Sequence, residues 1–217
     1  MEIGLYIWNL KNKFHLILLS FIFLNCNQIQ QKNKNIDNIN FEKIVSGSLV
    51  CRLGNGYFSG YFKKYASIEK KFSHIGIVSK ENDSLFVYHS EASEFTGIGF
   101  VKKELLSSFL NEIKIYDFYE LNFNDTINFQ IVEQVKQYYN LKVPFDMDFN
   151  SSDDKKLYCT ELIAISINKT LKDSIIKPTM TLNKRKLFAL DDIYLNENVK
   201  KITFANPASA SVSLVTE

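Results

Sequence analysis

The chain has 217 residues, which suits one domain with a full-sized core and a short appendage. Its 46% hydrophobic content excludes a largely disordered chain, and its formal net charge of +2 predicts no strong attraction to nucleic acid or anionic lipid. The one dense basic run, residues 183–186, is interpreted as a solvated loop rather than a binding patch.

The N-terminal residues differ in composition from the rest of the chain. Lys11 and Lys13 precede an apolar run, residues 14–24, which is shorter than the roughly 20 residues that span a bilayer and is typical of an export signal. Cys26 follows this run closely, and the order resembles a bacterial lipoprotein signal that is cleaved before a lipid-bearing cysteine. An ordinary signal peptide or membrane anchor that happens to contain a cysteine is the alternative.

This pattern leads to a predicted domain organisation. We expect a signal peptide over residues 1–25, a lipid-anchored polar tether over 26–42, one folded domain over 43–205 and a tail over 206–217. The tether is rich in Asn and Gln, which favours a flexible spacer between lipid and domain. The predicted location is therefore the periplasm or cell envelope, as an exported, membrane-anchored lipoprotein.

The elements expected in the folded domain follow one another as strands and helices. Apolar alternation and turn residues predict strands, and helical spacing predicts helices. The strands are expected at 48–53, 72–79, 84–89, 112–119 and 200–205, and the helices at 102–110, 125–139 and from 159 onward. Antiparallel strands with helices packed on them indicate an α+β domain.

Two histidines are predicted to lie side by side on this sheet. A turn centred on Glu81 and Asn82 pairs residues whose numbers sum to 163, so His74 would face His89. Directly opposed side chains have Cβ atoms about 4.5–5.5 Å apart, and buried imidazoles require polar partners. A lone histidine on a strand is usually structural, whereas a facing pair leaves a structural role and a functional one equally open.

Cys159 is the candidate nucleophile. It stands near the start of a predicted helix, where exposed amides and the helix dipole lower the pKa of a thiol. A thiolate can attack a carbonyl, a histidine can protonate the leaving amine, and a third polar group can hold the imidazole in the required tautomer. His89 fits that third position, with Glu91 as the backup. A buried helix cysteine is the alternative for Cys159 taken alone.

Other candidate groups are not assigned to chemistry. Cys51 lies in a strand-like run and is interpreted as a small buried hydrophobe, with a disulfide as the alternative. Four nearby carboxylates are interpreted as turn and cap residues, because their spacing lacks the glycine of a metal-binding loop: Asp146, Asp148, Asp153 and Asp154. We expect neither a metal ion nor an organic cofactor.

Four segments together resemble a known family. "GSLVCRLGNGYFSGYF", "FSHIGIV", "LFVYHSE" and "PFDMDFNSSDDKKLYCTEL" occur in the order seen in the permuted papain-like amidases of the YaeF/YiiX group, a circularly permuted branch of the NlpC-type cysteine peptidase superfamily. The resemblance covers residues 43–172. It implies a papain-like fold in which an antiparallel sheet or small barrel packs against helices. Here His74 precedes Cys159, as the permutation requires.

The resemblance also implies roles for individual residues. It makes Cys159 the nucleophile and His74 the general base, and its third catalytic position falls on His89. Glu91, Tyr158 and Glu161 are expected to contribute to substrate binding, and Glu161 could also cap the helix. Two positions depart from the family pattern, since Ser48 stands where Asp is common and Phe145 where Tyr is common.

The function that this resemblance implies is a thiol hydrolase that cleaves an amide bond, in a cell-wall peptide at the cell envelope. The alternatives are a lipid acyl hydrolase or acyltransferase with the same Cys–His dyad, and an inactive binding lipoprotein. A cleft lined by acidic and amide groups would favour a peptide, and a long apolar groove would favour acyl chains. The expected partners are this substrate and the membrane, through the lipid anchor, with no nucleic acid.

Overall fold

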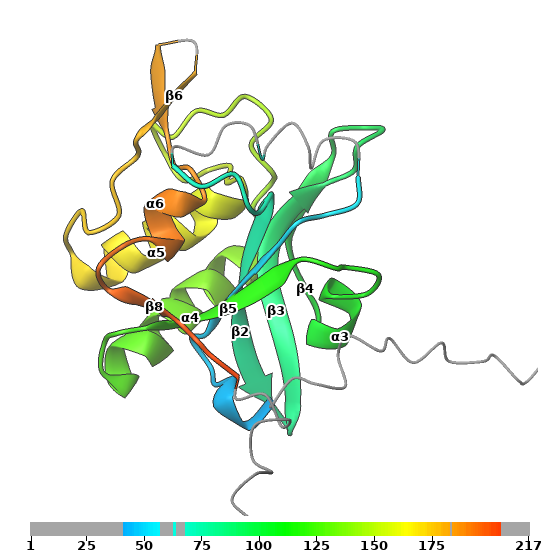
Figure 1. Cartoon of the computed structure of the whole chain (residues 1–217). Helices are drawn as coiled ribbons and strands as arrows, with labels where there is room; N and C mark the ends of the chain where they lie inside the picture. Colours follow the sequence, from blue (N-terminus) through cyan, green and yellow to red (C-terminus); the bar gives the residue numbers. More distant parts are fainter. Residues whose placement is uncertain (1–40, 57–62, 64–67, 183, 205–217) are drawn as a thin grey trace, which may run out of the picture. The chain divides into compact units, whose positions relative to one another are not determined.

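The computed structural model describes residues 41–56, 63, 68–182 and 184–204 (Figure 1). The chain divides into two compact units, residues 1–34 and 35–217, and all described residues belong to the second. The predicted signal peptide, Cys26 with its predicted lipid, most of the tether and the tail at 206–217 lie outside the described residues.

The described part of the chain forms a sheet with helices on both faces. Its six main strands are β1 (Leu49–Arg52), β2 (His74–Glu81), β3 (Ser84–Ala92), β4 (Gly99–Leu105), β5 (Tyr116–Leu121) and β8 (Val199–Lys201). The helical segments are η1 (Phe41–Lys43), α3 (Leu106–Phe109), α4 (Asp125–Asn140), α5 (Cys159–Leu171) and α6 (Asp191–Tyr194). A separate hairpin joins β6 (Met180–Leu182) to β7 (Arg185–Leu187).

The main sheet is open and antiparallel. Its strand order is β4-β3-β2-β1-β5-β8, and every pairing between neighbours is antiparallel. The expected α+β class is therefore confirmed. The small-barrel alternative is wrong, because β4 and β8 each pair on one side only and do not pair with each other.

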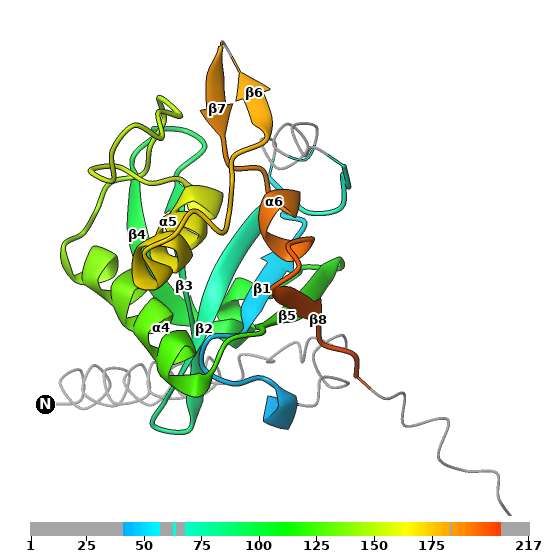
Figure 2. The ribbon, with the colours of Figure 1, turned by 90° about the vertical axis from the view of Figure 1, so that its left-hand side faces the viewer.

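The two faces of the sheet carry different helices. α4 and α5 cover one face, and the short helix α3 lies on the other (Figures 1 and 2). Alternate residues of a strand point to opposite faces, so Leu49 and Cys51 enter the larger core under α4 and α5 while Val50 enters the smaller core beside α3. Cys51 is fully buried and forms no disulfide, so its interpretation as a small hydrophobe is confirmed and the disulfide alternative is wrong.

Helix α4 supports the sheet from one side and is capped as its sequence allows. Its N-cap is Asn124, whose side chain accepts a hydrogen bond from the backbone N–H of Ile127. Its buried face repeats at helical spacing: Ile131, Val132, Val135 and Tyr138. Among the described residues no helix has both the length and the apolar character needed to cross a membrane.

The expected helix at 102–110 is largely wrong. Residues 99–105 form strand β4, paired with β3 over its whole length, and only Leu106–Phe109 are helical. The reason is tertiary: the exposed edge of β3 supplies a partner along all of β4, and this pairing overrides the weak local preference for helix. The expected strand at 112–119 begins later, as β5.

The predicted register of the β2–β3 hairpin is also wrong, by two residues. Glu81 pairs with Ser84, so the turn residues are Asn82 and Asp83, both with positive φ (46° and 60°) as two-residue hairpin turns of the favoured type require. Facing residues therefore sum to 165. Continued past the last paired residues, this register places His89 opposite Gly76. A slip of two residues preserves the face of every side chain, so the two histidines still share a face.

Gly76 provides the space that this arrangement requires. A Cβ at Gly76 would lie 2.4 Å from Cγ1 of Val87 and 3.2 Å from Cβ of His89. Val87 is fully buried and its side chain has little freedom to move away.

We expect Gly76→Ala to lower the free energy of unfolding by about 1–3 kcal/mol, the usual range for overpacking a core. Urea denaturation measures this change. In a double-mutant cycle with Val87→Ala, which removes the clashing methyl group, the cost of the added methyl should fall, and its 3.0 Å approach to the backbone oxygen of Tyr88 accounts for the cost that remains. Strict additivity of the two substitutions would contradict the proposed clash.

Candidate active site

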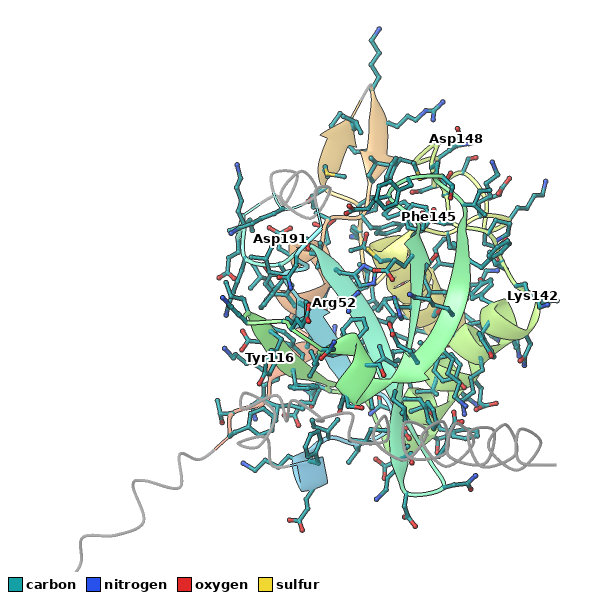
Figure 3. All side chains as sticks on the ribbon, turned by 90° about the vertical axis from the view of Figure 1, so that its right-hand side faces the viewer. Arg52, Tyr116, Lys142, Phe145, Asp148 and Asp191 are labelled. Atoms are coloured by element: carbon teal, nitrogen blue, oxygen red, sulfur yellow. The ribbon has the colours of Figure 1, made fainter. Side chains whose placement is uncertain are left out.

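A cavity of about 290 Å³ lies at the N-terminal end of α5 and brings together four of the predicted site residues: Cys159, His74, Glu91 and Tyr158. Arg52 of β1 also lines it. Glu94 of the β3–β4 turn lines it as well. Most of the remaining wall is apolar, and its large side chains come from the segment before α5, the β6–β7 hairpin and the segment before α6: Phe145, Met147, Phe149, Met180, Leu182, Leu187 and Phe188. Figure 3 shows Phe145 close to the hairpin.

Cys159 is the first residue of α5. The backbone N–H groups of Ile75, Thr160 and Cys159 itself form hydrogen bonds that favour the thiolate, but burial outweighs them and raises the pKa of the thiol to about 11. The expected lowering of this pKa is therefore wrong, because the site removes more hydration than the helix N-terminus replaces. At neutral pH Cys159 is a neutral thiol.

The two histidines belong to a hydrogen-bonded chain that ends on a carboxylate. Nε2 of His74 lies 2.7 Å from Nδ1 of His89, and Nε2 of His89 lies 2.6 Å from Oε1 of Glu104. The predicted contact between the histidines is thus confirmed, although their register is not. Both rings pack on Phe109 of α3, with ring centroids 5.7 and 5.0 Å away.

The chain of hydrogen bonds determines which nitrogens carry protons. Glu104 can only accept while ionised, so Nε2 of His89 donates to it and Nδ1 of His89 is left as an acceptor. Nε2 of His74 must then donate to that nitrogen, which leaves the lone pair of His74 on Nδ1. Burial lowers the pKa of both histidines, and for His74 the fields of His89 and Arg52 add to the effect. His74 is therefore a neutral imidazole with a basic Nδ1.

Glu104 was missed by the sequence analysis. It lies on β4, two residues beyond Lys102, the pairing partner of His89. A hydrogen bond from His89 is the main reason that the pKa of Glu104 is lowered. A correct prediction of strand β4 would have placed Glu104 near His89, but the sequence analysis expects a helix there.

Glu91 does line the cavity, but its oxygens are engaged with cations. Oε1 lies 2.9 Å from Nη2 of Arg52, and Oε2 lies 2.5 Å from Nζ of Lys102. The group that holds the imidazole of His74 is therefore His89, and Glu91, the alternative for that role, is not its partner. The ionised pair of Glu91 and Arg52 forms a polar wall beside the thiol.

A metal ion does not fit the site in this arrangement. Within the described part of the chain, one group offers three ligand atoms near one another, since those of His74, His89 and Glu91 lie within 4.8 Å. The two imidazole nitrogens already share a hydrogen bond, and Glu91 is bound by two cations whose charge opposes a third. The expected turn role of Asp146 is confirmed, because its carboxylate accepts from the backbone N–H groups of Asp148 and Asn150.

The remaining predicted substrate residues have structural contacts. Glu161 is fully buried and does not line the cavity; its Oε2 accepts from the backbone N–H of Tyr158 at 3.3 Å, as in a helix cap. The hydroxyl of Tyr158 accepts from the backbone N–H of Phe188 at 2.8 Å and lies 3.2 Å from Oγ of Ser151. Tyr158 therefore ties the start of α5 to the cavity wall.

Comparison with known proteins identifies a shared fold. The crystal structure described as metalloprotein YiiX from Escherichia coli O157:H7, DUF1105, aligns with a TM-score of 0.60 and 13% sequence identity. The match covers 75% of this chain and 98% of the YiiX chain. No family profile and no curated protein matches the sequence. The YiiX-like part of the resemblance is therefore supported at the level of the fold.

The buried carboxyl of Glu161 makes stability depend on pH. Burial raises its pKa to about 8, above the value near 4.3 of an unfolded chain. Between these two values the folded state holds a proton that the unfolded state has lost, so this contribution is present below pH 4 and falls as pH rises, by roughly 1.4 kcal/mol per pH unit.

We therefore expect Glu161→Gln to match the wild type near pH 4 and to be more stable at pH 8. Urea denaturation across this range measures the difference. Glu133→Gln, at a half-buried position on α4, is the matched control and should leave the pH profile unchanged. Parallel profiles for Glu161→Gln and wild type would contradict a raised pKa.

Alkylation tests the state of the thiol. With iodoacetamide, the rate at Cys159 should rise with an apparent pKa of about 11, well above the value near 8.5 of a free thiol. Peptide mapping by mass spectrometry separates Cys159 from the other cysteines, and the urea-unfolded chain provides the free-thiol reference. An apparent pKa below 8.5 in the folded chain would instead indicate a thiolate–imidazolium pair.

Proposed function

We propose that the chain is a cysteine hydrolase in which Cys159 forms a thioester with the acyl part of its substrate. The observation that carries this proposal is the meeting, in one cavity, of a helix-terminal thiol and an imidazole whose tautomer is set by His89 and Glu104. A purely structural histidine pair would not need a cavity or a neighbouring thiol.

The resemblance to permuted papain-like amidases supports the same assignment, as does the YiiX-like fold, and we extend it to a papain-like arrangement. YiiX is described as a metalloprotein. Because Nε2 of His74, Nδ1 of His89 and the carboxylate of Glu91 already have partners in this chain, we assign no step to a metal.

In the first step His74 acts as the general base. Both groups are neutral at rest, so Nδ1 of His74 accepts the thiol proton as sulfur attacks the substrate carbonyl, and a C–S bond forms. Within the described residues no hydrogen bond joins Sγ to the imidazole, so substrate binding must bring them into contact, as is common in free enzymes. The N–H groups at the start of α5 face the reacting centre and can stabilise the developing oxyanion.

In the second step the imidazolium returns its proton. It protonates the leaving nitrogen or oxygen, the bond to the carbonyl carbon breaks, and the thioester remains on Cys159. Water then attacks the thioester while Nδ1 of His74 accepts its proton, and release of the carboxylic acid restores the thiol. The carboxylate of Glu104, acting through His89, stabilises the imidazolium in both steps.

The lining of the cavity favours a substrate with an apolar acyl group. Aromatic and aliphatic side chains form most of the wall, whereas a cell-wall peptide would be better bound by acidic and amide groups. The alternative of a lipid acyl hydrolase or acyltransferase is thus favoured by a specific observation. Cleavage of an amide that carries an apolar acyl chain satisfies both hypotheses.

Export and lipid attachment at Cys26 remain proposals that rest on the N-terminal sequence. Metabolic labelling with a fatty-acid analogue in a bacterial host, with Cys26→Ser as the control, tests them directly. Label that persists in the control would contradict attachment at Cys26.

The acyl-enzyme is the intermediate to detect. We expect p-nitrophenyl esters to add one acyl mass to the intact chain, with rates that rise from acetyl to octanoyl because the longer chain fills the apolar cavity. Cys159→Ala should abolish the adduct, and His74→Ala should lower the acylation rate by about 10²- to 10⁴-fold. Cys51→Ser should behave as wild type. An adduct that persists in Cys159→Ala, or none in any form, would reject the proposal.

Glu104→Ala isolates the role of the carboxylate at the end of the chain. We expect a lower kcat than wild type, a smaller loss than in His74→Ala and an unchanged KM, because Glu104 acts on His74 through His89 and does not touch substrate. Glu120→Ala is the matched control, because Glu120 lies on β5, which three strands separate from β4 in the sheet. A wild-type kcat in Glu104→Ala would show that His89 suffices.

A further inference from the structure

Three neighbouring loops line one side of the cavity, and we call them the cavity rim: the β3–β4 turn (residues 93–98), the loop at 145–150 and the β6–β7 hairpin. A Cβ built at Gly97 would lie 3.5 Å from Cε of Met147, so the first two loops are in contact. The guanidinium of Arg185 donates to the backbone carbonyl of Asp148 at 3.0 Å, which joins the hairpin to the same loop. Figure 3 shows Asp148 next to the hairpin.

The cavity rim exposes large apolar side chains. Phe95 is 98% exposed, Ile98 66% and Met147 50%, and Met147 also lines the cavity. Exposed apolar side chains that are scattered singly are ordinary, whereas a group of them on adjoining loops at the mouth of a cavity is typical of an interaction surface. The apolar surface of the rim is therefore continuous with the apolar wall of the cavity.

The cavity rim also carries positive charge. Lys184, Arg185 and Lys186 are all exposed at the hairpin. The carboxylates nearby are partly offset by other lysines, since Asp148 lies 3.1 Å from Nζ of Lys156 and Asp153 lies 3.8 Å from Nζ of Lys155. The rim holds as many carboxylates as cations, but Asp146 is buried and Asp148 is paired with Lys156, so the exposed charge of the hairpin tip is positive.

We propose that the cavity rim docks on the surface of an anionic lipid bilayer. Exposed apolar side chains at loop tips enter the boundary between head groups and acyl chains, and basic side chains contact the phosphates, as in other interfacial proteins. The three exposed cations grouped on the hairpin favour this partner over an apolar protein surface, which would leave them unmatched. The basic run at 183–186, first interpreted as a solvated loop, thereby gains a partner.

Docking in this orientation has a consequence for the cavity. Its apolar wall would open directly onto the lipid, so an acyl chain could enter without crossing water. The docking itself does not depend on the chemistry of Cys159, so the two proposals can fail separately.

Tryptophan fluorescence tests the docking on the full chain. The sequence contains one tryptophan, Trp8, so Trp8→Phe combined with Phe95→Trp places a single probe on the cavity rim. On vesicles with one third phosphatidylglycerol, brominated acyl chains should quench this probe strongly. The matched probe, Trp8→Phe with Phe129→Trp, occupies an exposed position on α4 and should not be quenched. Both probes are placed in the same Trp8→Phe chain, so any binding through the N-terminal apolar run contributes equally to the two measurements.

A charge series tests the role of the hairpin. Neutralising Lys184, Arg185 and Lys186 together with Gln should weaken the docking equilibrium by roughly 100-fold, at about tenfold or less per cation. Quenching at position 95 should then disappear. The control set Lys80→Gln, Lys114→Gln and Lys142→Gln removes the same charge from exposed positions elsewhere and should preserve it.

Each outcome decides the proposal. Quenching at 95 but not at 129, lost only in the hairpin series, supports docking of the rim on anionic lipid. Equal quenching at both positions, or none at 95, overturns it. Cys159→Ala should leave the quenching unchanged, so an inactive chain that still docks would reject the hydrolase alone, and an active chain that fails to dock would reject the docking alone.

Discussion

The hydrogen bond from His89 to Glu104 is the interaction on which the candidate site depends. It makes Nε2 of His89 the donor, so Nδ1 of the same ring must accept and Nε2 of His74 must donate. Without the carboxylate, either imidazole could take either tautomer, and the lone pair of His74 would not be confined to Nδ1. One acidic residue on β4 thus determines the basic atom of a histidine on β2, through a ring that packs on Phe109.

Burial has opposite consequences for the groups of the site. It raises the pKa of the Cys159 thiol and lowers the pKa of His74, and both changes favour the uncharged form. A neutral thiol beside a neutral imidazole resembles the resting state of a serine hydrolase more than that of a preformed thiolate enzyme. Such a site is protected from adventitious oxidation and alkylation, because the reactive anion forms only during attack.

Prediction from the sequence succeeded where it needed only the two-residue alternation of side chains along a strand. The contact of His74 with His89 survived a register error, because a slip of two residues leaves both on one face. The sequence-based prediction failed where contacts between distant residues determine the structure. The apolar residues of 102–110 have helical spacing, yet β4 pairs with β3. Because this strand was not predicted, Glu104 was not recognised as a partner of His89. The prediction for the pKa of Cys159 was wrong for a related reason. A helix N-terminus can be recognised in the sequence, but the loss of hydration around a thiol cannot.

The order of the site residues along the chain also bears on how the fold is assembled. His74, His89 and Glu104 belong to three consecutive strands, β2, β3 and β4, whose pairing closes only short loops. Cys159 joins them across a much longer separation, when α5 docks on the sheet. Local contacts form sooner than distant ones. A partly folded chain can therefore complete its proton acceptor before its thiol is in place, so the two halves of the proposed dyad meet only in the finished domain.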